Sequence, residues 1–413
     1  MRDKNLPEIR FQGFSGKWEQ MKLGEVVEIK DSARISNTLW VSKGVPYLRS
    51  SDLANDEIEG KLFISNETYQ SYKDKTGAPE NDDVLFTSGG KVGVTYHKID
   101  DNPVYVQGGS ILYAKTSTSN KLSGIYLKAF FSSPTMTKYI DGASTGLTIK
   151  HFTLKPANAA PIFISSLKEQ NKIGEFFKQI DDITAFHQQE LTTLKQTKQG
   201  FLQKMFPKKG ESVPEVRFDG FGGNWEEQKL NYFLEVSNEK NYENEFSKRD
   251  VFSVSGEYGI VNQIDFQGRS FAGESVANYG IVKKGYVVYT KSPLKANPYG
   301  IIKTNNGKSG IVSTLYAVYK PKETLHPPII EIMFENDSVI NNYLRPLVNK
   351  GAKNDMKVRN EDVLKGKIRL PDIEEQIKIS NFFKQLDDTI ALHQRELDAL
   401  KETKKAFLQK MFV

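Results

Sequence analysis

Two long stretches of the chain, residues 169–206 and 375–412, each carry one hydrophobic stripe with heptad spacing. Both lack proline and are rich in good helix formers, so they are predicted to be long helices, the first ended by Pro207. At 1.5 Å per residue each helix would be roughly 57 Å long, too long for one small domain to cover. We therefore expect the stripes to pack on each other. The stripe residues, called the seam below, are Phe177, Ile180, His187, Leu191, Leu194, Phe201, Phe383, Leu386, His393, Leu397, Leu400 and Phe407.

Both stretches belong to an internal repeat. Residues 169–206 match residues 375–412 at 25 of 38 positions, and residues 6–23 match residues 213–230 at 11 of 18 positions. The chain is therefore two tandem halves related by a pseudo-two-fold. The expected parts are a first domain at 1–165 that includes 6–23, a central helix at 166–207, a second domain at 208–371 that includes 213–230, and a C-terminal helix at 372–413.

Two variable segments, residues 24–165 and 231–371, lie between the repeats. Both hold short apolar runs separated by Gly-rich breaks, which is typical of mixed α/β domains. A short helix is expected in each, near Ile125–Phe131 and Ile329–Phe334. The fold class is therefore α+β, with two mixed α/β domains joined by two long helices. The segments share only fragments, such as Ile111-Leu112-Tyr113-Ala114 against Thr314-Leu315-Tyr316-Ala317.

Composition removes several classes of function. The chain has 413 residues and no Cys, which excludes disulfide frameworks, thiolate metal sites and Cys nucleophiles. No apolar run approaches 18 residues and the first residues lack an apolar core, so we expect neither secretion nor membrane spanning, and a cytoplasmic location follows by default. The net charge of +6 is compatible with a polyanionic partner without demonstrating one.

The distribution of charge is more informative than its sum. Lys and Arg equal Asp and Glu in 24–165, at 15 each, whereas 231–371 holds 20 bases and 15 acids. Residues 275–322 contain eight Lys and no acid, interleaved with Tyr, Ser, Thr and Asn. Such a stretch suits a phosphate-contacting face, although a run of charge is more often a solvated surface. The Gly-rich residues 87–93 could cradle a phosphate through backbone N–H groups, or form an ordinary turn.

Catalytic motifs for nucleotide chemistry are missing from the sequence: there is no G-x-x-x-x-G-K-[ST], G-x-G-x-x-G or H-E-x-x-H. Asn297-Pro298-Tyr299 resembles the tetrapeptide with which adenine amino-methyltransferases hold a flipped base, but the second Pro is absent. A methyltransferase is therefore kept as an alternative function, and a protein-interaction scaffold that no longer reads DNA as another.

Two histidines, His187 and His393, occupy equivalent seam positions. They could bind a metal or act as polar residues that fix helix register. We favour register because the seam positions supply no carboxylate or Cys, and we expect no metal site.

The whole chain resembles the specificity subunits of type I restriction-modification enzymes. The resemblance depends on the blocks from Glu169-Gln170 to Phe206 and from Glu375-Gln376 to Phe412, and on Gly44-Val45-Pro46-Tyr47-Leu48-Arg49-Ser50-Ser51-Asp52-Leu53 and Asp83-Val84-Leu85-Phe86-Thr87-Ser88-Gly89-Gly90. The second variable segment departs from the first, with Phe252-Ser253-Val254-Ser255-Gly256 and Tyr289-Thr290-Lys291-Ser292 instead.

The resemblance implies two target-recognition domains at opposite ends of an antiparallel coiled-coil pair, each reading one half of an asymmetric bipartite site in double-stranded DNA. It implies no catalysis and no cofactor in this chain. Methylation with S-adenosylmethionine would come from two modification (methyltransferase) subunits docked on the helices. ATP- and Mg-dependent translocation and cleavage would come from restriction (motor-nuclease) subunits.

DNA contacts are expected in Gly-rich or turn-like stretches, where loops can enter a groove. The chosen residues are Arg49, Ser50, Thr87, Ser88, Lys91, Thr145 and Lys150 in the first variable segment, and Lys291, Lys295, Asn297, Tyr299, Lys353, Asn354, Lys357 and Arg359 in the second. Repeat order further predicts that residues 6–23 pack near Phe407–Phe412, with Trp18 and Trp225 as equivalent anchors.

Overall fold

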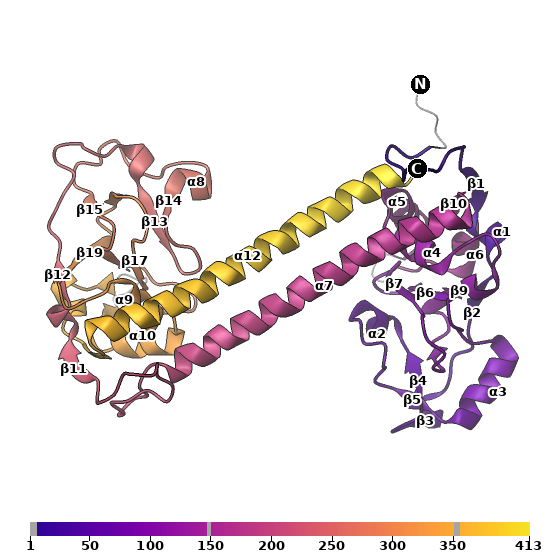
Figure 1. Ribbon diagram of the computed structural model, residues 1–413, viewed down its shortest axis with the longest axis horizontal. Helices are drawn as coiled ribbons and strands as arrows, with labels where there is room; N and C mark the ends of the chain where they lie inside the picture. Colours follow the sequence, from indigo (N-terminus) through magenta and orange to yellow (C-terminus); the bar gives the residue numbers. More distant parts are fainter. Residues whose placement is uncertain (1–5, 147–149, 351–355) are drawn as a thin grey trace. The chain divides into compact units, whose positions relative to one another are not determined.

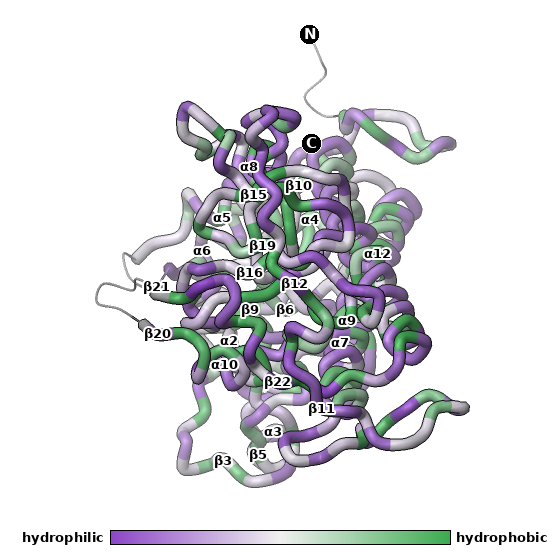
Figure 2. Tube along the Cα trace, turned by 90° about the vertical axis from the view of Figure 1, so that its left-hand side faces the viewer, coloured by the Kyte–Doolittle hydropathy of each residue, from purple (hydrophilic) through white to green (hydrophobic). Residues whose placement is uncertain are grey.

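The computed structural model describes residues 6–146, 150–350 and 356–413 (Figure 1). The chain divides into two compact units. The first unit comprises residues 1–189 and 394–413, and the second comprises residues 190–393. Each unit therefore contains one mixed domain and one half of each long helix. Along the chain in Figure 2, hydrophobic positions concentrate in the strands and short helices of the domains, whereas the connecting loops are mainly hydrophilic.

The two predicted long helices are present as α7 (Leu167–Lys204) and α12 (Ile373–Met411), each beginning two residues before the repeated block. Their first turns explain these starts. The Ser166 hydroxyl accepts a hydrogen bond from the Glu169 backbone N–H, and the Asp372 carboxylate accepts one from the Glu375 backbone N–H. Both are ordinary N-cap contacts, and they satisfy amides that the helix leaves unpaired.

The two helices run antiparallel within each unit. In the first unit, Phe176 of α7 meets Phe407 of α12 with ring centroids 4.9 Å apart, and Asp181 pairs with Lys404. In the second unit, Phe201 meets Phe382 at 4.9 Å and Lys198 pairs with Asp387 at 2.6 Å. In each unit, a residue further along α7 contacts a residue less far along α12. This order confirms the antiparallel arrangement.

The predicted seam is the inward face of both helices. Phe177 and Phe383 are 1% and 0% exposed, Leu191 and Leu397 are 3% and 1% exposed, and the other seam residues are buried or half-buried. The stripe also includes a lysine in each helix. Lys198 is buried and Lys404 half-buried, and each reaches an aspartate of the facing helix. The apolar stripe therefore tolerates a lysine where a carboxylate lies opposite.

One four-stranded antiparallel sheet forms the centre of each domain. In the first unit its order is β2-β9-β6-β7, and in the second it is β12-β19-β16-β17. The strands of the first are β2 (Ile29–Asp31), β6 (Val84–Thr87), β7 (Thr95–His97) and β9 (Ile111–Ala114), and those of the second are β12 (Leu234–Val236), β16 (Val287–Thr290), β17 (Ile302–Thr304) and β19 (Tyr316–Pro321). The central strands β6, β9 and β16 are buried at every position, as expected for strands covered on both faces.

Strand pairing corrects one alignment made from the sequence. Thr87 ends β6 opposite Ile111, and Thr290 ends β16 opposite Tyr316, so Ile111 corresponds to Tyr316. The fragment Ile111–Ala114 matched to Thr314–Ala317 is thus shifted by two residues. A shift of two keeps each side chain on the same face of a strand, so the hydrophobic pattern could not reveal it.

Helices that follow the sheet are also equivalent. The expected short helices are α4 (Gly124–Phe131) and α9 (Pro328–Met333), followed by α5 (Pro134–Ala143) and α10 (Asp337–Leu344). The shorter elements after the sheets are α6 (Leu154–Ala159), α11 (Asn360–Val363), β20 (Asn349–Lys350) and β21 (Met356–Lys357), whereas α1 (Leu23–Val26) precedes β2.

The domains differ in the elements that lie before and after the central hairpins β6-β7 and β16-β17. The first unit inserts the sheet β3-β5-β4-β8 with two helices, and the second inserts the hairpin β13-β14, one helix and the pair β15-β18. The first insertion holds β3 (Trp40–Val41), β4 (Val45–Leu48), α2 (Ser50–Ala54), β5 (Phe63–Ile64), α3 (Asn66–Thr76) and β8 (Tyr105–Val106); the second holds β13 (Phe252–Ser255), β14 (Gly259–Asn262), α8 (Gln263–Gln267) and β15 (Gly280–Val282), with β18 (Gly310–Val312) beside β15.

The repeated segments 6–23 and 213–230 each add a strand beside the start of a long helix. In the first unit β1 (Glu19–Lys22) pairs with β10 (Pro161–Ile164), and in the second β11 (Glu226–Lys229) pairs with β22 (Lys367–Leu370). The packing predicted for residues 6–23 is confirmed, because the Ile9 N–H donates to the Lys410 carbonyl at 2.9 Å.

Trp18 and Trp225 are 1% and 2% exposed, and each belongs to the core that contains the end of a long helix. Trp225 lies against Phe206, with ring centroids 6.0 Å apart, and Trp18 shares its cluster with Phe412, the repeat counterpart of Phe206. The prediction of equivalent anchors is therefore confirmed.

A buried ion pair explains why both repeats contain Arg and Glu. The Arg10 guanidinium donates to Glu169, with Nη2 to Oε2 at 2.8 Å, and Arg217 donates to Glu375 through Nε and Nη2, both at 2.7 Å. The glutamates are 1% and 0% exposed. The neighbouring Gln376 amide accepts from the His326 N–H and donates to the Pro371 carbonyl, as Gln170 does at the equivalent place in the first unit. These contacts fix each domain to the start of a long helix.

Among the described residues, no helix is both long and apolar enough to cross a bilayer.

Candidate nucleic-acid interface

The hairpin between β6 and β7 forms a loop of residues 88–94, called the first loop. Thr87 holds the two sides of this loop together. Its hydroxyl donates a hydrogen bond to the Lys91 carbonyl at 2.5 Å and accepts one from the Val94 N–H at 3.0 Å. Thr87 is fully buried and Ser88 is 3% exposed, whereas Gly90 and Lys91 are exposed. The buried residues therefore hold the loop, and its tip faces solvent.

Two other predicted positions lie beside the first loop. The Ser88 N–H and the Ser50 hydroxyl both donate to the Ser110 carbonyl, at 2.8 and 2.7 Å. Ser50 begins α2, so this shared acceptor brings the start of α2 next to the loop. Arg49, the residue before it, donates two hydrogen bonds to the Asp52 carboxylate, and these bonds raise the Arg49 pKa. Its side chain remains 35% exposed.

The segment after α5 also joins the first loop. Thr145 and His151 exchange backbone hydrogen bonds at 3.0 and 2.8 Å, and the Gly90 N–H donates to the Lys150 carbonyl at 3.2 Å. Thr145, Lys150 and His151 are exposed. Lys150 pairs with Asp141 at 2.9 Å, but both side chains are more than half exposed, so water screens this pair. All seven positions predicted in the first variable segment thus belong to one cluster.

Sequence reasoning missed the turn that precedes β9. The Gly109 N–H donates to the Asp31 carboxylate at 3.0 Å, and a Cβ on Gly108 would lie 1.7 Å from the Ser32 carbonyl oxygen. Only glycine permits this approach, which brings exposed Arg34 to the same cluster. When the oxygen and nitrogen of the Gln107 side-chain amide are exchanged, the oxygen accepts a hydrogen bond from Arg34 Nη2 at 3.1 Å. The consecutive glycines Gly108 and Gly109 are the feature of the sequence that could have predicted this turn.

The second unit builds the equivalent loop in another way. Residues 291–301, called the second loop, connect β16 to β17 and are four residues longer than the first loop. Thr290 repeats the role of Thr87, since its hydroxyl accepts from the Ile301 N–H at 3.0 Å. The Lys291 N–H donates to the Leu315 carbonyl at 3.0 Å, as Ser88 does to Ser110. The loops therefore start from one scaffold and then diverge.

Asn297 is part of the internal support of the second loop. It is 8% exposed, and its amide donates to the Asp337 carboxylate at 2.8 Å. Tyr299 packs on the core of the second unit, and its carbonyl accepts from the Tyr289 hydroxyl at 2.7 Å. Lys295 is exposed, whereas Lys291 is partly buried, and burial together with nearby Lys240 lowers its pKa.

The remaining predicted positions in the second variable segment follow α10 in the sequence. Lys353 and Asn354 lie outside the described residues, and Lys357 is described only as a backbone partner of Asn349 in the β20-β21 pair. Arg359 caps the start of α11; its side chain is 77% exposed and pairs with Asp362 at 3.2 Å. The β20-β21 pair follows α10 just as the Thr145–His151 bridge follows α5.

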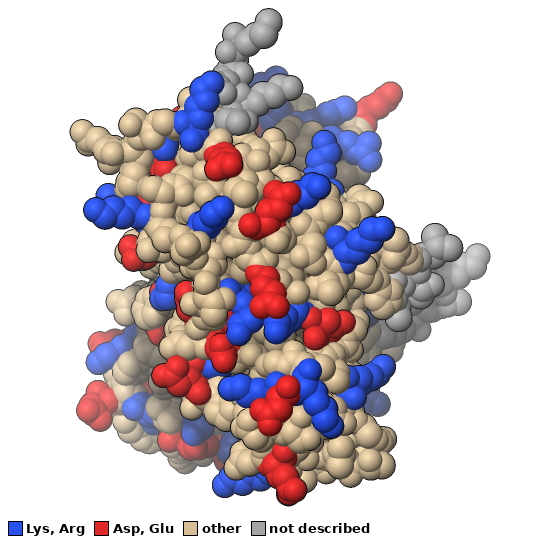
Figure 3. Space-filling view, turned by 90° about the vertical axis from the view of Figure 1, so that its right-hand side faces the viewer, with Lys and Arg blue, Asp and Glu red and all other residues tan. Residues whose placement is uncertain are grey.

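The basic stretch 275–322 is less free than its composition indicates. Lys283, Lys303 and Lys320 pair with glutamates, at 2.6, 3.2 and 3.8 Å, and Lys322 donates to a backbone carbonyl. Lys295 makes no ion pair among the described residues. Figure 3 shows a face of the first unit instead, where acidic and basic side chains are interspersed and no single-sign patch is visible.

Comparisons with known proteins agree with this architecture. The family described as the type I restriction modification DNA specificity domain matches residues 15–196 and 223–402. The MjaVIII type I restriction enzyme specificity subunit of Methanocaldococcus jannaschii is 21% identical over 98% of this chain and 95% of its own length. A sequence from the same organism, provisionally assigned as the MjaX specificity subunit, is also 21% identical over the same shares.

A crystal structure of the type I restriction-modification system S subunit from M. genitalium has the same fold, with a TM-score of 0.61, 12% identity and 99% of each chain covered. The family match covers most of the chain and falls once on each half. This chain belongs to the family of type I restriction-modification DNA specificity subunits.

Proposed function

We propose that this chain reads an asymmetric, bipartite site in double-stranded DNA, one half through each domain, as the specificity subunit of a type I restriction-modification complex. One observation carries the proposal. The same four-stranded sheet, with the same threonine at the end of the same strand, presents a loop of different length and sequence in each unit. A reader of two unlike half-sites needs two unlike surfaces on one scaffold.

The exposed members of the first cluster supply the chemistry for DNA. Lys91, Lys150 and Arg34 offer charges to phosphates, and the amide of Gln107 and the hydroxyl of Thr145 can meet base edges or sugars. Thr87 and Ser88, and Asn297 in the second unit, are assigned to loop support because their side chains are buried.

We also propose that two methyltransferase subunits dock on the long helices, and that restriction subunits join them. Phe186 and Leu392 occupy equivalent positions of α7 and α12 and are 57% and 47% exposed. Ile183, one turn before Phe186, is 46% exposed. Large apolar side chains on the outward face of a helix are typical of a surface that a partner covers. S-adenosylmethionine, ATP and Mg would belong to those subunits.

The alternative that this chain is itself a methyltransferase gains no support from the loop geometry. A flipped base would need the Asn297 side chain free to hold it, and that amide is instead committed to Asp337. The other alternative, a protein-interaction scaffold that no longer reads DNA, differs from the proposal only in that it would not bind DNA. A DNA-binding measurement therefore distinguishes the two.

Sequencing of methylated adenines tests the proposal. DNA treated with this chain and its methyltransferase subunit should carry methyl groups in one two-part motif. Replacing residues 88–94 with a Gly-Ser linker of equal length should relax one half of the motif, and replacing residues 291–301 should relax the other. If either replacement altered both halves, the assignment of one half-site to each domain would be wrong. Methylation by the chain alone would support the enzyme alternative.

A further inference from the structure

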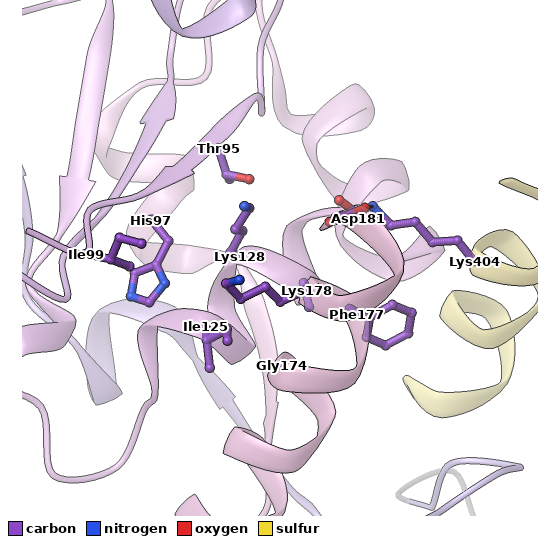
Figure 4. A pocket seen from close by; sticks show the side chains of 12 residues that line it. Thr95, His97, Ile99, Ile125, Lys128, Gly174, Phe177, Lys178, Asp181 and Lys404 are labelled. Carbon is purple, nitrogen blue, oxygen red and sulfur yellow. Dashed lines mark hydrogen bonds and ion pairs between the residues drawn. The ribbon is translucent and has the colours of Figure 1, made fainter. Parts of the chain in front are cut away.

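A cavity of about 80 Å³ lies in the first unit where β7, α4, α7 and the end of α12 meet (Figure 4). Thr95 and His97 line it from β7, and Phe177 and Lys178 line it from α7. Its walls are partly apolar and partly cationic. The residues proposed to contact DNA do not line it.

The basic side chains of the cavity differ in their partners. His97 pairs with Asp82 at 2.7 Å, Lys178 pairs with Asp182 at 2.5 Å, and Lys404 pairs with Asp181. Lys128 of α4 extends into the same space, and it has no ion pair within the part of the chain that the structure describes. Lys128 is thus the one lysine of the cavity that no acid pairs with among the described residues.

The second unit shows what occupies the equivalent place there. Lys198 is the repeat counterpart of Lys404, and it donates both to Asp387 at 2.6 Å and to Glu335 at 2.7 Å. Lys404 has the counterpart of Asp387 but not of Glu335. The side chain of Lys198 is 10% exposed and that of Lys404 is 28% exposed. The second unit therefore fills this position with its own carboxylate.

Backbone contacts identify the residue that replaces Glu335. The Glu335 N–H donates to the Ile332 carbonyl, and the Ser132 N–H donates to the Ala129 carbonyl. Each directly precedes the N-cap residue of the next helix. By the same spacing, Lys128 stands where the second unit has Glu331. Two acids of the second unit are thus a serine and a lysine in the first.

We propose that this cavity receives an acidic side chain from the protein docked on the first unit, namely its methyltransferase subunit. This inference depends on the proposed function. A carboxylate is favoured over a phosphate because a carboxylate fills the equivalent position in the second unit, and because Ile99, Ile125 and Phe177 give the cavity apolar walls. The partner on the second unit need supply no such group. Two identical subunits would then dock with unequal affinity on helices that share 25 of 38 residues in the repeated blocks.

Exchange of the differing residue tests the inference. Ser132→Glu gives the first unit its own carboxylate beside Lys404 and Lys128, and Ser132→Gln is a neutral control of the same size. The full chain would be titrated with purified methyltransferase subunit and the bound copies counted by native mass spectrometry. We expect two copies on the wild type, and roughly tenfold weaker binding of one copy to Ser132→Glu, because like charges would meet in the cavity. Ser132→Gln should bind within about threefold of wild type.

Other outcomes separate the possible failures. Unchanged affinity of both copies for Ser132→Glu would overturn the inference while leaving the proposed function intact. Binding of no methyltransferase subunit by the wild type would overturn both. If Ser132→Glu instead weakened binding of duplex DNA to the chain alone and lowered its salt dependence by about one phosphate contact, the occupant would be a phosphate and the inference wrong. Hydrogen exchange of α4 in each variant shows whether the first unit remains folded.

Discussion

Removal of one charge should loosen the second domain from its helix. Glu375 is completely buried at the first turn of α12, and both of its oxygens accept hydrogen bonds from Arg217 at 2.7 Å. Glu375→Gln keeps the shape of the side chain but replaces one acceptor oxygen with a donor NH2. The Arg217 guanidinium is 14% exposed and keeps its bond to the Gly223 carbonyl at 2.6 Å. One N–H of Arg217 then faces another donor.

The cost follows from these contacts. Breaking a buried ion pair by changing one partner costs about 3–5 kcal/mol, because a charge remains without its counterion. Arg217 keeps two acceptors, the Gly223 carbonyl and the amide oxygen of the introduced glutamine, and some contact with water, so we expect a value near the lower end, about 3 kcal/mol. The first unit has its own Arg–Glu pair, so its stability should stay within about 0.5 kcal/mol of the wild-type value.

Hydrogen exchange in increasing urea measures this cost for each unit separately, which matters because a chain of two units need not unfold in one step. Protection should fall in β11 and in the first turns of α12 and remain unchanged in β1. Glu374→Gln, next to it and exposed, is the matched control. Glu169→Gln should produce the mirror effect in the first unit. A cost below about 1 kcal/mol for Glu375→Gln would show that the pair behaves like a surface ion pair and would refute the reasoning.

Three further predictions concern oligomerisation, DNA binding and pH. A fragment of residues 1–207 should form an antiparallel homodimer in which α7 pairs with a second α7 and which selects an inverted repeat of one half-site. This helix pairing should be weaker than that of α7 with α12 by about 1–2 kcal/mol for each apolar seam pair that is lost. Sedimentation showing only monomer at high micromolar concentration would contradict this. Lys91→Ala with Lys150→Ala should weaken binding to all duplexes and lower the salt slope by about two, whereas an unchanged slope would make these lysines a solvated face. Burial lowers the pKa of His326 from 6.5, so the second unit should be fully stable above that pH and lose stability as pH falls through the lower folded value; His326→Gln should remove this dependence in pH-resolved unfolding curves.

The prediction that the seam histidines fix register and bind no metal rests on an incomplete set of nearby carboxylates. We favour a register role for His187 because no seam position supplies a carboxylate. In the structure, however, the carboxylate of Glu396, a residue next to the seam, lies 3.3 Å from His187 Nδ1. A heptad pattern names the residues that point straight at the partner helix. Side chains on the flanking positions are long enough to reach across, and the pattern does not count them.

Local information determined much of this protein from the sequence alone. Heptad spacing predicted both long helices and their inward faces, because that periodicity is a property of consecutive residues. Self-similarity predicted the two halves and the packing of Trp18 and Trp225, since equal sequences fold alike. The short helices α4 and α9 followed from apolar content over a few residues. The helices needed only neighbouring residues, whereas the two halves and the packing of residues 6–23 came from comparing the two copies of the repeat.

Apart from the packing that the repeat predicted, only the tertiary structure decided which individual distant residues meet. Arg10 and Glu169 are separated by 159 positions, and nothing near either residue indicates its partner. The same holds for Lys198 with Glu335, for the first loop with Lys150, and for the burial of Asn297 inside a loop that looked exposed. Such contacts depend on how the strands and helices pack, and the hydrophobic effect that drives packing is non-directional and does not encode a pairing in any one segment. The physical reason is the range of the interactions. Periodicity among neighbouring residues determines the helices and strands, whereas the partners of charged side chains and loops are determined only when those elements pack into one core.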